Sequence, residues 1–187
     1  MHISEPYYLI VDLEATCSHK NKIIPRHEME IIEIGAVILN NQTFTIESEF
    51  QTFIRPQRHP QLTPFCTELT TITQDQVDPA PLFPQALDEF VTWYTPYLPA
   101  RFGSWGKYDY HQFIQDCRYH EIIYPLPEHI NIKRQFSKAI GQSRDYGLNN
   151  ALKHLQLTFD GTPHRGLDDA RNIARIVTTI LSRDQGS

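Results

Sequence analysis

The sequence predicts an α/β fold that opens with an antiparallel sheet of three strands and continues mainly as helices. Two observations support this prediction. Three strand-length runs, rich in apolar and β-branched residues, fill most of residues 7–54 and are joined by short polar connections. Further along the chain, apolar residues recur at helical spacing behind N-capping signals. Because the 187 residues contain no repeat, low-complexity tract or linker, we expect a single domain spanning residues 1–187.

The strands are placed by composition and by the turn residues that bound them. The opening three are expected at residues 7–17, 29–39 and 43–54. Gly35 interrupts the second of them, which indicates either a bulge or a close approach of another backbone. A short fourth strand is expected at residues 101–105.

Capping residues, prolines and glycines place the helices. The segments that read as helical are residues 64–69 behind Thr63, a segment opening with the capping box at residues 73–76, and residues 83–94, 109–120, 132–140, 148–155 and 166–181. The apolar spacing in residues 83–94 predicts an amphipathic helix packed on the sheet. In residues 109–120, the side chains of Phe113, Ile114 and Cys117 are expected to face inward.

Charge and cysteine content narrow the function classes. The net charge of −5, without an evident basic stripe, disfavours a protein that packages nucleic acid but allows a metal-dependent enzyme. The three widely spaced cysteines, Cys17, Cys66 and Cys117, indicate reduced thiols and not a disulfide framework. No apolar run is long enough to cross a membrane, and no secretory pattern opens the sequence. We therefore expect a cytoplasmic protein without a membrane partner.

Two carboxylates, Asp12 and Glu14, interrupt the first apolar strand. Because side chains alternate along a strand, both lie on one face while Leu9, Val11 and Leu13 point the other way. Two like charges about 6–7 Å apart on such a strand are unfavourable unless a cation lies nearby. Oxygen ligands suit Mg²⁺ or Mn²⁺, so the pair indicates a metal site; an edge strand with carboxylates facing water is the alternative.

The last helix begins with two adjacent aspartates that helical phase separates. Asp169 is in line with the apolar stripe of residues 173, 176 and 180, so it is predicted to head the buried face. Asp168 lines up with Asn172, Arg175 and Thr179, which we expect to form a solvent face. Since a buried charge needs a partner, Asp169 is the functional candidate and Asp168 a first-turn helix charge.

Two further residues join this set through their position. His164 immediately precedes the last helix, close to Asp169. Asp109 follows the short fourth strand and starts a helix, where it is either a metal ligand or an N-cap.

Taken in order, Asp12, Glu14, Asp109, His164 and Asp169 resemble the motifs of the DEDDh 3′-to-5′ exonucleases of the DnaQ-like superfamily, which have the ribonuclease H-like fold. The sister DEDDy group would have a tyrosine four positions before the last aspartate, where this chain has an arginine. Residues 12–17, 30–34, 69–77 and 164–169 further resemble the Eri-type subgroup, which includes the histone-mRNA 3′ exonucleases.

This resemblance implies a fold, a cofactor and a mechanism. The fold would be a mixed central sheet, with parallel strands after the antiparallel meander, flanked by helices. Two divalent metal ions, Mg²⁺ or Mn²⁺, would be held by the four carboxylates, Asp12, Glu14, Asp109 and Asp169. His164 would accept a proton from the attacking water, and hydrolysis would release 5′-mononucleotides.

The resemblance also implies a substrate. Phe65, Leu69 and Trp105 would contact the terminal base, although ordinary helix packing explains Phe65 and Leu69 equally well. The main chain at Ala15 and Thr16 would meet the 3′ ribose. The partner would be the 3′ end of a nucleic acid, with single-stranded RNA favoured; no protein partner is implied. A DNA-preferring exonuclease is the alternative within this chemistry, and a module that binds 3′ ends without cleaving them is the alternative from another class.

Overall fold

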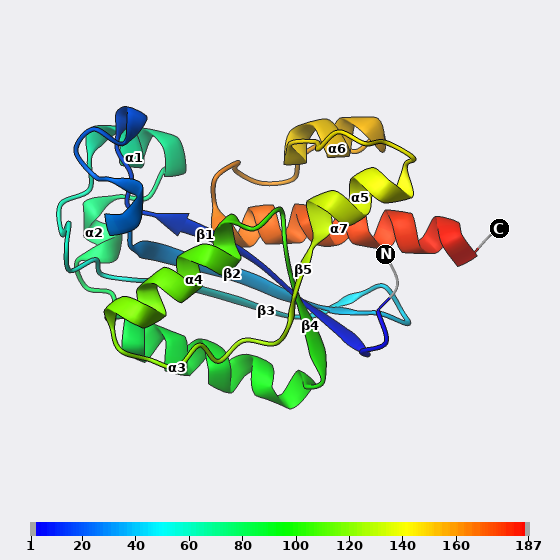
Figure 1. The fold of residues 1–187 in the computed structure, drawn as a ribbon, viewed down its shortest axis with the longest axis horizontal. Coiled ribbons are helices and arrows are strands. Elements are labelled where there is room, and N and C mark those ends of the chain that lie inside the picture. Colours follow the sequence, from blue (N-terminus) through cyan, green and yellow to red (C-terminus); the bar gives the residue numbers. More distant parts are fainter. Residues whose placement is uncertain (1–2, 186–187) are drawn as a thin grey trace.

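The computed structural model describes residues 3–185 as a five-stranded mixed sheet with helices on both faces (Figure 1). The strands lie in the order β3-β2-β1-β4-β5. Their bounds are β1 (Tyr7–Ala15), β2 (Ile31–Asn40), β3 (Ile46–Phe53), β4 (Ala100–Ser104) and β5 (His129–Asn131). The first three pair antiparallel, whereas β4 runs parallel to β1 and β5 parallel to β4. The predicted meander followed by parallel strands is confirmed.

Seven α-helices surround the sheet in the described part of the chain. They are α1 (Pro64–Thr70), α2 (Gln74–Val77), α3 (Phe83–Tyr94), α4 (Tyr108–Tyr119), α5 (Ile132–Ala139), α6 (Leu148–His154) and α7 (Gly166–Gln185). Local capping chemistry fixes the first two as predicted: the Thr63 hydroxyl accepts the N–H of Cys66, and Thr73 and Gln76 form a capping box. Short 3₁₀ turns lie at His19–Asn21, Arg26–Glu28 and Thr95–Tyr97.

The alternation of β1 divides the core into two layers. Leu9, Val11 and Leu13 pack with α3 and α4 on one face, while Tyr8 and Ile10 pack with α7 and α5 on the other. Figure 1 shows the same division, with α3 and α4 on one side of the sheet and α5, α6 and α7 on the opposite side. Asp12 and Glu14 share the face of Tyr8 and Ile10, so β1 presents its carboxylates toward α7.

Gly35 marks a close approach of backbones. A β-carbon at this position of β2 would lie 1.9 Å from the carbonyl carbon of Gly166 and from the nitrogen of Leu167. Between the two expectations for Gly35, the contact with another backbone is the one that the structure shows. The missing side chain therefore lets the first turn of α7 lie directly on the sheet.

Besides shifts of a few residues in element bounds, the strand β5 and the inward face of α4 differ from the sequence-based prediction. The strand β5 was not predicted, because three residues are too short for a periodic signal. Ile114 is only half-buried; Gln112 and Asp116 are buried instead, because they hydrogen-bond to each other and to the backbone at Met29 and Ile31.

The cysteines behave as expected. Cys17, Cys66 and Cys117 are all free and buried. Within the described residues, the structure contains no helix with the length and apolar character needed to cross a membrane.

Candidate active site

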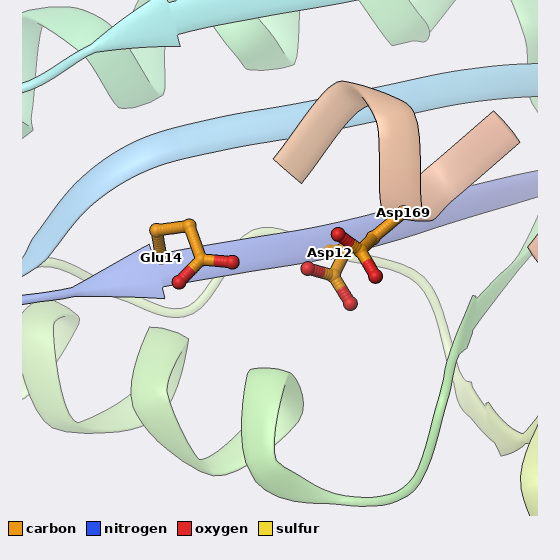
Figure 2. Close-up of side chains that lie close together, drawn as sticks. All are labelled: Asp12, Glu14 and Asp169. Atoms are coloured by element: carbon orange, nitrogen blue, oxygen red, sulfur yellow. The ribbon is translucent and has the colours of Figure 1, made fainter. Parts of the chain in front are cut away.

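Three carboxylates converge where β1 ends and α7 begins. One carboxylate oxygen from each of Asp12, Glu14 and Asp169 lies within 4.8 Å of the others. Figure 2 shows the Glu14 side chain turned toward the neighbouring carboxylates of Asp12 and Asp169. Glu14 is buried and the other two are partly buried. The spacing along β1 and the helical phase of Asp169 therefore combine as the sequence analysis expected.

Asp109 reaches the site from α4, which packs on the face of the sheet opposite to α7. The pairing of β4 with β1 ends at Ile10, so the N–H of Leu13 has no strand partner on that side. Asp109, in the first turn of α4, accepts this N–H through Oδ1 at 3.1 Å. It lies outside the group of three converging oxygens but lines the same pocket. Asp109 thus ties α4 to β1 and places a fourth carboxylate beside the cluster.

His164 is exposed and has a left-handed backbone, with φ of 62°. It lines the pocket together with Asp169. The following N–H, from Arg165, donates to Oδ2 of Asp169 at 3.1 Å, so the Asp169 carboxylate caps the turn that carries the histidine. The histidine and the aspartate are therefore held in one local structure.

An ion pair that the sequence analysis missed anchors this turn. Glu33 on β2 is fully buried and receives Nε and Nη2 of Arg165, each at 3.2 Å, and the N–H of Gly166 at 3.1 Å. Gln51 on β3 donates to the same carboxylate. A glutamate within an otherwise apolar buried strand was the available signal, because such a charge needs a partner.

Asp168 faces away from the cluster, but the prediction of a solvent face along its stripe is wrong. Asn172, one turn further along α7, is fully buried and binds the carbonyl oxygens of Asp160 and Asp168. Asp168 itself accepts the N–H of Thr162 at 2.9 Å. The segment before His164 folds over this stripe, so Asp168 and Asn172 hold that segment to the helix.

Burial and mutual repulsion dominate the electrostatics of the cluster. Burial raises the pKa of Asp12 well above its usual range, and the neighbouring carboxylates raise it further. Burial, followed by the charge of Asp169, raises the pKa of Glu14 to about 9. Burial also raises the pKa of Asp169 to about 7 and that of Asp109 to about 6, although backbone N–H groups oppose both shifts. Such a set of oxygens fits a divalent cation, whose charge would offset this repulsion.

A pocket of about 310 Å³ opens above the carboxylates. Of the residues that the resemblance assigns to substrate binding, Ala15, Leu69 and Trp105 line it. Two others do not: the N–H and hydroxyl of Thr16 are both bonded to the backbone of Glu30, and Phe65 packs in a small apolar cluster beside His19. The lining also includes five residues to which the sequence analysis gave no role in the site: Leu13, Cys17, Met29, Tyr108 and Leu148.

The fold and the site define a class. The mixed five-stranded sheet flanked by helices matches the ribonuclease H-like fold of solved 3′-exonucleases. The exonuclease family model (RNase_T) matches residues 9–177, and the chain belongs to this family.

Curated relatives agree with this assignment. Human 3′-5′ exoribonuclease 1 is 38% identical in an alignment 185 positions long, which covers 94% of this chain and 52% of that protein. ERI1 exoribonuclease 3 of Bos taurus is 38% identical in an alignment 188 positions long, which covers 95% of this chain and 54% of that protein. The chain therefore spans about half the length of the curated relatives it matches.

A solved structure supports the same family. The nuclease domain of 3′hExo, a DEDDh family member bound to rAMP, superposes with a TM-score of 0.89 at 35% identity, covering 96% of this chain and 94% of that one. A 3′-exonuclease in a structure of histone mRNA stem-loop recognition gives a TM-score of 0.90 at 34% identity, covering 96% and 65%.

Proposed function

We propose that this protein is a metal-dependent 3′-to-5′ exoribonuclease that removes 5′-mononucleotides from the 3′ end of single-stranded RNA. One observation supports the proposal above all others. Asp12, Glu14 and Asp169 bring carboxylate oxygens within 4.8 Å of one another, in a pocket that Asp109 and His164 also line. We further propose that residues 1–187 act as one exonuclease domain.

The four carboxylates would hold two divalent ions, Mg²⁺ or Mn²⁺. Asp12, Glu14 and Asp169 would supply the three converging oxygens, and Asp109 would supply the fourth carboxylate from α4. When bound, such ions activate water and stabilise the leaving 3′ oxygen. The contribution of the chain is to preset these oxygens: β1 fixes two of them, α7 the third, and the Leu13 N–H orients Asp109.

His164 is the candidate for general base. A ring nitrogen of an imidazole side chain can accept a proton from the attacking water. Its exposed position on the pocket wall would allow the proton to pass on to solvent. The bond between the Arg165 N–H and Asp169 would keep the histidine turn in place as the substrate enters.

The pocket volume of about 310 Å³ suits one nucleotide better than a duplex end. Leu69 and Trp105 would contact the terminal base, and Tyr108 and Leu148 would extend this apolar wall. The backbone at Ala15 would meet the ribose. Thr16, bonded to Glu30, would hold that backbone, and Phe65 would support α1 beneath Leu69.

The test is a degradation assay on 5′-labelled RNA and DNA oligonucleotides with Mg²⁺ or Mn²⁺. We expect RNA to shorten from its 3′ end, and we expect EDTA, Asp12→Ala and His164→Ala each to abolish this. Asp88→Ala, at an exposed carboxylate on α3, is the matched control and retains activity. Full activity in Asp12→Ala would refute the metal assignment. Equal degradation of DNA would refute the RNA preference, and binding of RNA without shortening would favour the non-cleaving module.

A further inference from the structure

The turn between β4 and α4 forms one rim of the pocket. Trp105 and Tyr108, at its two ends, both line the pocket. Gly106, between them, has a φ of 121°, which disfavours any residue with a side chain. The backbone of this rim is therefore bare at Gly106, and a neighbouring side chain lies over it.

That side chain is Lys133, from the first turn of α5. A β-carbon placed on Gly106 would lie 3.5 Å from Nζ of Lys133 and 3.6 Å from its Cε. Lys133 is half-buried, and its charge acts on Asp109 by Coulomb attraction. The lysine ammonium therefore lies over the rim turn at Gly106, near enough to Asp109 for its charge to act on that carboxylate.

Lys133 has no ion-pair partner among the described residues. The described carboxylates that form salt bridges pair with other cations, such as Glu33 with Arg165 and Glu49 with Arg171. Lys107, in the same turn as Gly106, is exposed and likewise makes no ion pair in the described part of the chain. Lys107 lines a separate pocket with Glu128 and His129, so Lys133 is the lysine that lies over the bare backbone of Gly106.

An exonuclease that holds the terminal nucleotide in its pocket must let the retained strand leave across a rim. This strand carries one negative charge for each linkage, and an ammonium group binds phosphate oxygens through charge-assisted hydrogen bonds. Arg165 is occupied by Glu33, which leaves Lys133 as an available cation whose charge acts on Asp109. We propose that Lys133 binds the RNA phosphate immediately 5′ to the scissile one. This inference rests on the proposed exoribonuclease activity.

Short substrates isolate the contact. In a dinucleotide NpN the only phosphate is the scissile one, whereas NpNpN adds one upstream linkage. We define the length ratio as kcat/KM for NpNpN divided by kcat/KM for NpN. Lys133→Met is expected to lower this ratio about 10-fold, the usual effect of losing one hydrogen bond to a charged group. Lys133→Arg should retain most of it. Lys138→Met, at an exposed position on the same helix, is the matched control and should leave the ratio unchanged.

A neutral methylphosphonate at the upstream linkage tests the same contact from the substrate side. It should lower the wild-type ratio by a similar factor and have little further effect in Lys133→Met. An unchanged ratio in Lys133→Met, or a methylphosphonate effect as large in the variant as in the wild type, would overturn the inference.

If the wild type cleaves neither substrate, the proposed hydrolysis is wrong, and the lysine contact is decided by binding. Lys133→Met should then weaken binding of labelled single-stranded RNA and reduce the slope of log affinity against log salt by about 0.7. The same slope in wild type and variant would exclude the contact.

Discussion

Nε and Nη2 of Arg165 each lie 3.2 Å from the buried carboxylate of Glu33, so the residue next to His164 is tied to the start of β2. The adjacent N–H of Gly166 donates to the same carboxylate. Neither Glu33 nor Arg165 belongs to the carboxylate cluster. Both nevertheless fix where α7 begins, and hence where Asp169 and His164 stand relative to β1.

The first prediction concerns this ion pair. Arg165→Met leaves Glu33 buried without its cation, and breaking a buried pair in this way costs roughly 3–5 kcal/mol. We expect chemical denaturation to show a loss of unfolding free energy of that order. Arg171→Met, which breaks the more exposed pair with Glu49 on the same helix, should cost less than about 1 kcal/mol.

A double-mutant cycle measures the interaction energy between Glu33 and Arg165 separately from the effect of each single substitution. Because Glu33→Gln removes the charge that Arg165 neutralises, the double variant should be more stable than the sum of the single losses predicts. Additive losses would show that the two side chains act independently.

The second prediction concerns Gly35. A β-carbon there meets the backbone of α7 at 1.9 Å, and backbone cannot give way as a flexible side chain can. Gly35→Ala should therefore displace the start of α7 and strongly lower both the melting temperature and RNA hydrolysis. Gly147→Ala, where no atom lies within 4 Å of the added carbon, should change stability by only about 1 kcal/mol or less. Similar losses in the two variants would contradict the proposed contact.

The sequence predicts those parts of the site that depend on local periodicity. Alternation along β1 places Asp12 and Glu14 on one face, and the helical repeat places Asp169 on the inner stripe of α7. Both predictions require only the geometry of one element. The capping signals at Thr63 and Thr73 are local in the same sense.

The remaining features depend on which elements meet in the fold. Nothing near Glu33 in the sequence indicates Arg165, which lies 132 residues away. The burial of Asn172 depends on a preceding segment folding back over α7, so helical phase alone gives the wrong exposure. Lys133 gains its place at the pocket rim only because α5 packs beside the turn at Gly106.

The third prediction separates the adjacent aspartates. Asp169→Ala removes a carboxylate of the cluster and should abolish hydrolysis. Asp168→Ala should retain far more activity but lower the melting temperature, because its carboxylate holds the Thr162 N–H and Arg171. Assays and melting curves measured on both variants decide the assignment, which fails if Asp168→Ala is the less active enzyme.

The fourth prediction concerns pH and metal. Carboxyl groups with raised pKa values keep their protons in the folded state where the unfolded chain has released them. These protonated groups stabilise the folded state fully at any pH below the pKa that they have in the unfolded chain. The stabilisation is lost as the pH rises through their pKa values in the folded protein, which are about 6 for Asp109, 7 for Asp169 and 9 for Glu14. In EDTA, the cluster should therefore lower the melting temperature progressively from about pH 4 to pH 9.

Asp12→Asn isolates this contribution, since it removes one of the mutually repelling charges. In EDTA at pH 8 the variant should melt at a higher temperature than the wild type, and the difference should shrink toward pH 5. Added Mn²⁺ should reverse the order, because a cation that binds only the folded state stabilises it and the variant has lost a ligand. Asp88→Asn should follow the wild type under all of these conditions. If Asp12→Asn is no more stable than the wild type in EDTA at pH 8, repulsion among the four carboxylates does not destabilise the metal-free protein.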